Sequence, residues 1–169
     1  MPRRSLQFPT HCHEQDCVLN VGQIRLQIMR QSGSDFAANQ QPVSANDWET
    51  VKKGGDSAIK KWITDNMNNR TCVVVLIGEE TASRPWVQYE IEKAWKDGRG
   101  LLGIHIHNLN CPNGGKGTMG KSPFDGNSFK DTDGKVKTIP CKNPSSSDAY
   151  GDIKKNLEAW IEEAIALRA

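Results

Sequence analysis

Residues 71–109 read "TCVVVLIGEETASRPWVQYEIEKAWKDGRGLLGIHIHNL", and this segment decides the fold. Residues 71–78 are apolar and rich in β-branched side chains, which is typical of a strand covered on both faces. Residues 100–109 have the same character, and a helical pattern over 83–98 separates the two. The segment therefore predicts a βαβ unit with two parallel strands. We expect 71–78 to be an interior strand of the sheet.

The predicted helix is amphipathic, but Glu90 lies inside its apolar arc. At about 100° per residue, with Trp86 at zero, Glu90 falls near 40°, between Trp86 and Ala94. The opposite side carries the polar residues that we expect to face solvent: Gln88, Glu92 and Lys96. Two interpretations of Glu90 follow. It is either a carboxylate paired with Arg84 or Lys93, or a partly desolvated group that lines a cleft, where tuned catalytic groups are found.

The rest of the chain supplies further helices around this unit. A helix is predicted from Asn46 to about residue 68, with the pair Gly54-Gly55 weakening it or breaking it in two. The pattern over 148–169 predicts a final helix. Residues 3–12 are a candidate first strand and 17–31 a candidate first helix.

Residues 110–147 are rich in Gly, Pro, Ser, Asn and Lys and have no period. Such a stretch inside a compact domain is either functional or without order, so we expect a loop insertion that lacks regular structure. The order of elements predicts a single domain over 1–169. Its fold class is α/β, a three-layer flavodoxin-like sandwich around a mostly parallel sheet, whose ligands bind beyond the carboxyl ends of the strands.

The composition excludes several classes of function. Lys plus Arg is 22 and Asp plus Glu is 20, with the charges interleaved, so we expect no nucleic-acid or membrane partner. Five cysteines without framework spacing indicate reduced thiols and a cytoplasmic protein. The stretch "HCHEQDC", 11–17, holds ligand types, but its spacing fits no standard zinc module, and we expect neither a metal site nor a bound cofactor.

The motif "RPWVQYEI", 84–91, resembles the W-x-x-x-E helix of TIR domains that cleave NAD. Together with "VSANDWE", "KKGGDSAIKKWI" and "GLLGIHIHNL", it resembles the TIR-like family of the bacterial Thoeris anti-phage defence system, the sensor subunit. "SPFD", 122–125, also recurs in that family. The resemblance implies a TIR-like fold and an NAD glycohydrolase or ADP-ribosyl cyclase with NAD as its substrate. It further implies self-assembly, a phage trigger and an effector protein that receives the signal.

Carried over residue by residue, the resemblance makes Glu90 the catalytic carboxylate, with Trp86 packed against it. It places Phe8, His11, Asn46 and Trp48 in the binding site. From its composition and its place after the strand 100–109, we expect the segment 111–147 to be mobile and to fold over bound nucleotide as a lid. The first strand departs from the family pattern, since "LQFPTHCHEQD" keeps the spacing of Phe8 and His11 but differs at Pro9, Thr10 and Cys12. The alternative function is a non-catalytic TIR-like module that scaffolds an assembly.

Overall fold

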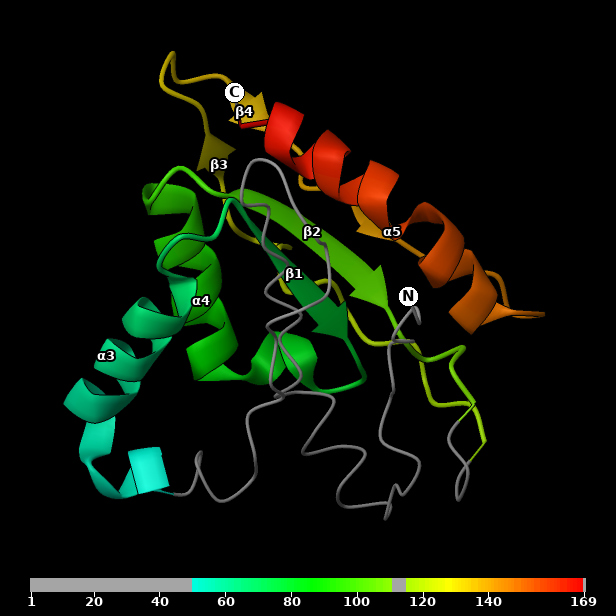
Figure 1. Cartoon of the computed structure of the whole chain (residues 1–169), viewed down its shortest axis with the longest axis horizontal. Helices are drawn as coiled ribbons and strands as arrows, with labels where there is room; N and C mark the ends of the chain where they lie inside the picture. Colours follow the sequence, from blue (N-terminus) through cyan, green and yellow to red (C-terminus); the bar gives the residue numbers. More distant parts are fainter. Residues whose placement is uncertain (1–49, 111–114, 169) are drawn as a thin grey trace, which may run out of the picture.

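The computed structural model describes residues 50–110 and 115–168, which form a parallel sheet with helices on both faces (Figure 1). Strands β1 (Cys72–Ile77) and β2 (Gly100–His105) pair in parallel, in a register that runs from Cys72 with Gly100 to Ile77 with His105. Helix α4 (Pro85–Lys96) connects them. The predicted βαβ unit is confirmed.

A third strand, β5 (Cys141–Lys142), pairs in parallel with the other side of β2. Among the described strands, β2 is therefore the middle one and β1 has one neighbour. The prediction that β1 is interior stays a prediction, because the candidate first strand lies outside the described residues. The candidate helix 17–31 lies outside them as well.

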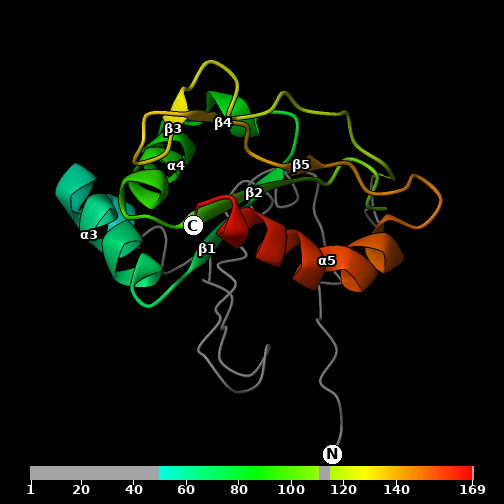
Figure 2. The same cartoon turned by 90° about the horizontal axis from the view of Figure 1, so that it is seen from above.

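Both faces of β1 are covered, as its apolar sequence predicted. Val73 packs with α4 and with α3 (Gly55–Met67), whereas Cys72 and Val74 pack with α5 (Ala149–Ala166) on the opposite face. Figure 2 shows α5 on one side of the sheet and α3 and α4 on the other. The fold is thus an α/β sandwich with a mostly parallel sheet.

The Gly54-Gly55 pair breaks the second predicted helix. Residues 50–53 are helical, Gly54 forms a turn, and α3 begins at Gly55 with φ +73°. Glycine has no Cβ, so this left-handed conformation costs it little. Helix α5 matches the predicted final helix.

The expectation that residues 110–147 lack regular structure is wrong for residues 115–147. Strands β3 (Phe129–Lys130) and β4 (Val136–Lys137) form an antiparallel pair, and β5 belongs to the main sheet. The physical reason is a set of apolar anchors: Phe124, Phe129 and Ile139 are each 6% exposed and join the core beside α4. A movement of part of this segment over a nucleotide stays a prediction.

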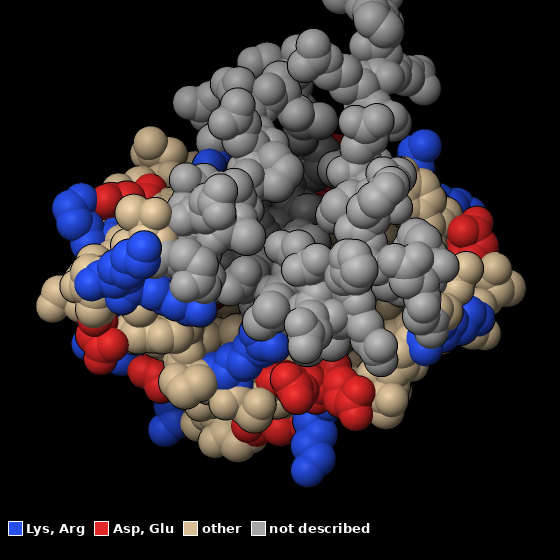
Figure 3. All heavy atoms as spheres, turned by 90° about the horizontal axis from the view of Figure 1, so that it is seen from below, with Lys and Arg blue, Asp and Glu red and all other residues tan. Residues whose placement is uncertain are grey.

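The surface mixes charges of both signs. On the face drawn in Figure 3, lysine and arginine alternate with aspartate and glutamate around the part of the chain that the structure describes. No helix found in residues 50–110 and 115–168 is long and apolar enough to cross a membrane.

Candidate active site

The carboxyl ends of β1 and β2 lie level, because Ile77 pairs with His105. The turn 78–84 leaves β1 at this edge, and residues 106–110 leave β2 there. Open α/β sheets bind ligands at this edge. The candidate site therefore comprises these two loops and the start of α4.

The buried polar side chains of the described residues are Thr81, Glu90 and His105, with 3, 4 and 6% exposure. Thr81 belongs to the turn after β1, Glu90 lies in the second turn of α4, and His105 ends β2. Burying polar groups costs free energy. Three of them on adjacent elements at the ligand edge mark this region as the candidate site.

The turn that leads into α4 is fixed by Thr81. The Thr81 hydroxyl accepts a hydrogen bond from the Gly78 amide at 2.9 Å and donates to the Leu76 carbonyl at 3.3 Å. Pro85 then occupies the first turn of α4, where its missing N–H and fixed φ are favourable. The direction in which α4 leaves the sheet is set by these contacts.

Glu90 points into the protein from the middle of the helix face that packs on the sheet. Its Oε1 atom is buried. On one side of Glu90, Tyr89 contacts α3: the ammonium group of Lys60 lies 5.7 Å from the centre of the Tyr89 ring. On the other side, Trp95 meets β3 through Phe129, with ring centroids 5.3 Å apart. The Glu90 carboxylate therefore lies between the contacts that α4 makes with α3 and with β3.

The two cations that were candidate partners of Glu90 have carboxylates of their own. Lys93 pairs with Asp97 at 3.1 Å, and Arg84 pairs with Glu80 at 3.6 Å. In both pairs each side chain is at least one-fifth exposed. Each cation therefore has a partner near the surface, and the role of Glu90 stays a prediction.

Trp86 lies one turn before Glu90 and is half-buried. Its ring packs on the core and meets the edge of Tyr89, with centroids 6.0 Å apart. The structure thus places Trp86 and Glu90 on the same helix. The four other predicted site residues lie outside the described residues: Phe8, His11, Asn46 and Trp48.

The assignment of Gln88 to a solvated face is wrong. Its side-chain amide donates to the Pro123 carbonyl at 3.0 Å and to the Ala82 carbonyl at 3.2 Å. The segment around Pro123 covers this side of α4, and a helical wheel of α4 alone contains no sign of that cover. Glu92 and Lys96 are exposed, as predicted.

His105 and His107 share a face of β2 and its extension, with ring centroids 6.0 Å apart. Burial, and then the nearby His107, lower the pKa of His105 below its ordinary value. The buried Nδ1 atoms of both rings lack a hydrogen-bond partner in the described structure. Asn108 donates to the Pro144 carbonyl at 2.9 Å and ties the loop after β2 to the chain after β5.

Within residues 50–110 and 115–168, we find no reactive thiol and no metal-binding cluster at the candidate site. Cys72 is a buried free thiol; burial, and then Glu162, raise its pKa to about 12, so it stays protonated. No three His, Cys, Asp or Glu side chains in this part of the chain are placed to hold a metal ion. The ligand types in 11–17 lie outside it.

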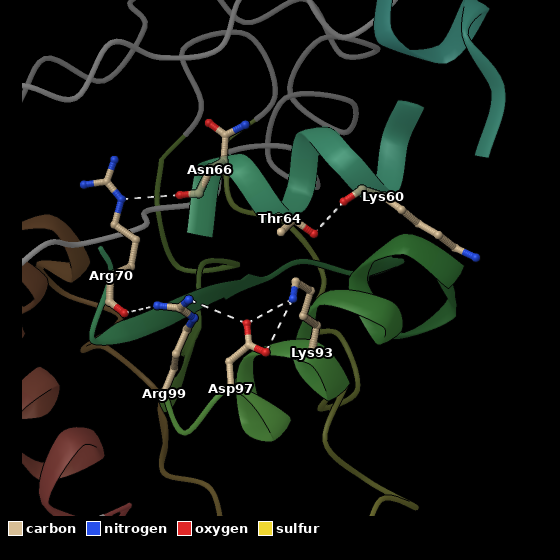
Figure 4. A network of polar contacts seen from close by, with 7 residues as sticks. All are labelled: Lys60, Thr64, Asn66, Arg70, Lys93, Asp97 and Arg99. Carbon is tan, nitrogen blue, oxygen red and sulfur yellow. Dashed lines mark hydrogen bonds and ion pairs between the residues drawn. The ribbon is translucent and has the colours of Figure 1, made fainter. Parts of the chain in front are cut away.

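A different polar network lies at the amino edge of the sheet (Figure 4). Asp97 follows α4 and pairs with Lys93 and, at 3.5 Å, with Arg99. Arg99 also donates to the Arg70 carbonyl, and Arg70 Nε donates to the Asn66 carbonyl at 3.4 Å. This network fixes the end of α4 that is remote from the candidate site.

Comparison with known proteins identifies relatives of the chain. A protein of Bacillus cereus (strain MSX-D12), named "Putative cyclic ADP-D-ribose synthase ThsB1", is 41% identical over 78 residues. Those residues are 46% of this chain and 41% of that protein, so the match covers less than half of either.

The family model described as "Thoeris protein ThsB, TIR-like domain" matches residues 8–111. This range includes all six predicted site residues, along with β1, α4 and β2. The SPFD stretch and α5 lie beyond it. Since the match covers more than half of the chain, the chain belongs to the TIR-like domain family of the Thoeris protein ThsB.

Proposed function

We propose that this protein cleaves the bond between nicotinamide and ribose in NAD and forms a cyclic or conjugated ADP-ribose. The observation that carries the proposal is Glu90, a carboxylate that is 4% exposed and lies near the ligand edge of a TIR-like fold. The name of the Bacillus cereus relative, a cyclic ADP-D-ribose synthase, supports the choice of substrate.

The chemistry suits a buried carboxylate. As the C1′–N bond breaks, its electron pair moves to the pyridinium nitrogen, and nicotinamide leaves as a neutral molecule. Positive charge develops on the ribose in an oxocarbenium-like transition state, which a nearby carboxylate stabilises. A nucleophile then attacks C1′ and loses a proton to solvent. An adenine nitrogen in this role closes a cycle, another acceptor gives a conjugate, and water gives ADP-ribose.

The catalytic role assigned to Glu90 makes no demand for a metal or a nucleophilic side chain. Glu90 stabilises the developing charge and holds the ribose hydroxyls, while Trp86 limits access of water to the carboxylate. Because the environment of Glu90 excludes water, its electrostatic effect on the ribose is larger than it would be in solution.

In the cell, the product would act as a signal to a separate effector protein during phage infection. Turnover would start when a phage trigger or self-assembly completes the site. A partner that binds the competent conformation raises its population. We therefore expect low turnover by dilute protein and higher turnover on assembly or with phage lysate.

The test compares NAD turnover by the wild type, Glu90→Gln and Glu92→Gln, each with and without phage lysate. Glu90→Gln keeps the shape of the side chain and removes its charge, so it should abolish turnover with an unchanged melting temperature. Glu92→Gln is the matched control, since Glu92 lies on the exposed side of the same helix.

Wild-type turnover by Glu90→Gln would remove Glu90 from the reaction. Failure of the wild type to bind or cleave NAD under every condition would favour the non-catalytic scaffold.

A further inference from the structure

We propose that Gln88 is a positioning residue for Glu90, acting through a clamp between α4 and residues 120–127. The inference rests on the proposed function, in which Glu90 stabilises the transition state. It assigns a positioning role to a part of the chain that lies beyond the family match, which ends at residue 111.

The clamp is centred on the side-chain amide of Gln88. Its nitrogen donates to the carbonyls of Pro123 and Ala82, at 3.0 and 3.2 Å. Its oxygen accepts from Asn127 Nδ2 at 3.1 Å, and Asn127 also donates to the Pro123 carbonyl at 3.4 Å. Gln88 thus joins three parts of the chain: α4, the turn before it and the segment 120–127.

The same segment touches the turn before α4 at a second point. A Cβ added to Gly120 would lie 1.9 Å from the Gly78 carbonyl oxygen, so the two backbones are in direct contact there. Gly120 is buried. Only glycine permits this approach. The segment therefore holds the turn 78–84 at Gly78 and, through Gln88, at Ala82.

The segment itself is anchored to the sheet. Phe124 is 6% exposed and lies over Gly103 of β2, where an added Cβ would come within 2.9 Å of the phenyl ring. The Ser122 hydroxyl contacts the thiol of Cys141 in β5 at 3.6 Å and accepts from the Phe124 amide at 3.2 Å. The clamp consequently fixes α4 relative to the strands rather than to a free loop.

Glu90 depends on this clamp because it lies two residues after Gln88 on the same helix. Through its bonds to the Ala82 and Pro123 carbonyls, Gln88 is a polar anchor of the first turns of α4. A carboxylate carbon lies about 6 Å from the helix axis, so a rotation of the helix by about 10° about that axis displaces the carboxylate by about 1 Å. A misplacement of that size can cost on the order of 100-fold in rate.

The experiment measures kcat and KM for NAD in the assembled, active protein. Gln88→Ala should lower kcat by about 10- to 100-fold and change KM by a much smaller factor, because most of the effect of Glu90 is on charge that develops in the transition state. Asn127→Ala should lower kcat in the same direction. The double variant should lose less than the product of the two single losses, because both residues act in one network.

Asn156→Ala is the matched control. The Asn156 amide is also half-buried and bonds to Asp152, at 2.9 Å to the backbone and 2.7 Å to the side chain, but within α5. Gln88→Ala and Asn156→Ala should lower the melting temperature by similar small amounts. Of these two variants, Gln88→Ala should change kcat and Asn156→Ala should not. Equal kcat in the two variants, with Glu90→Gln inactive, would overturn the clamp and leave the proposed function in place.

A second readout needs no turnover. In NMR spectra of protein labelled with ¹³C in glutamate carboxyl groups, the Glu90 signal is the one that is absent from the spectrum of Glu90→Gln. The chemical shift of this signal is followed against pH. Gln88→Ala should change the midpoint of that titration, and Asn156→Ala should not. A changed midpoint in a protein that never cleaves NAD would support the clamp while rejecting the proposed function. An unchanged midpoint would reject the clamp.

Discussion

The two ends of α4 are held by different chemistry. Its carboxyl end lies in a network of charged side chains, in which Asp97 pairs with Lys93 and Arg99. Its amino end carries an ion pair between Arg84 and Glu80 at 3.6 Å. It is tied to the segment 120–127 by neutral groups, namely the Gln88 amide, backbone carbonyls and the contact between Gly120 and Gly78.

The difference follows from what each end carries. Glu90 lies near the amino end of α4, and the proposed reaction needs its carboxylate in a fixed position. The hydrogen bonds of Gln88 orient the helix without placing a further charge beside the candidate site. The carboxyl end lies away from that site and is held by ion pairs. We therefore expect changes at the carboxyl end of α4 to lower the free energy of unfolding, and changes at its amino end to lower kcat. The predictions below test this division.

The largest effect on stability is expected from Trp95→Ala. Trp95 is 9% exposed, packs against Phe129, and donates to the Lys130 carbonyl at 2.9 Å. Removing a buried indole costs about 3–5 kcal/mol of unfolding free energy. Urea unfolding measures the loss, with Trp95→Phe as a milder control. The kcat of the folded fraction should change little; a loss of kcat as large as that of Glu90→Gln would contradict the division.

A smaller effect is expected from pH, through His105. Because burial lowers its pKa in the folded protein, the folded state favours the neutral ring. The stabilisation is complete above the unfolded pKa of about 6.5, and it falls as the pH drops below that value. One proton gives a slope of at most about 1.4 kcal/mol per pH unit.

Urea unfolding at pH 7.5 and pH 5.5 measures this slope, and His105→Leu should reduce it. An equal slope in the variant would show that other groups cause the pH dependence.

The smallest effect is expected from Asp97→Asn. Its carboxylate is one-third exposed, and exposed pairs contribute about 0.2–1 kcal/mol. The loss should disappear in about 1 M salt, where the Debye length is about 3 Å. Chemical unfolding at two salt concentrations measures it, and NAD turnover should not change. A salt-independent loss would show that Asp97 acts through its position at the end of α4 instead.

The sequence was most informative where elements are long and periodic. The apolar run of β1, the amphipathic pattern of α4 and the three- and four-residue spacing in α5 predicted their positions, and the same helical wheel singled out the buried Glu90. A weak point or a break at Gly54-Gly55 was expected because glycine disfavours helix interiors.

Periodicity failed for residues 115–147, because β3, β4 and β5 have only two residues each. Two residues show no alternation, and the anchors Phe124, Phe129 and Ile139 are irregularly spaced among Gly, Ser and Lys. Gln88 was misassigned for a related reason. Its partner Pro123 lies 35 residues further along the chain, and the amphipathic pattern of a helix does not indicate which distant segment will cover it.

The placement of β5 also has a consequence for the order of folding. Strands β1 and β2 and helix α4 are contiguous in sequence, so their contacts close short loops and form early. β5 reaches β2 only after a connection of about 35 residues closes, and residues 120–127 reach Gln88 by a similar span. Non-local contacts of this kind form late and open first. We therefore expect mild denaturant to detach residues 120–142 and stop NAD turnover while the β1–α4–β2 unit stays folded.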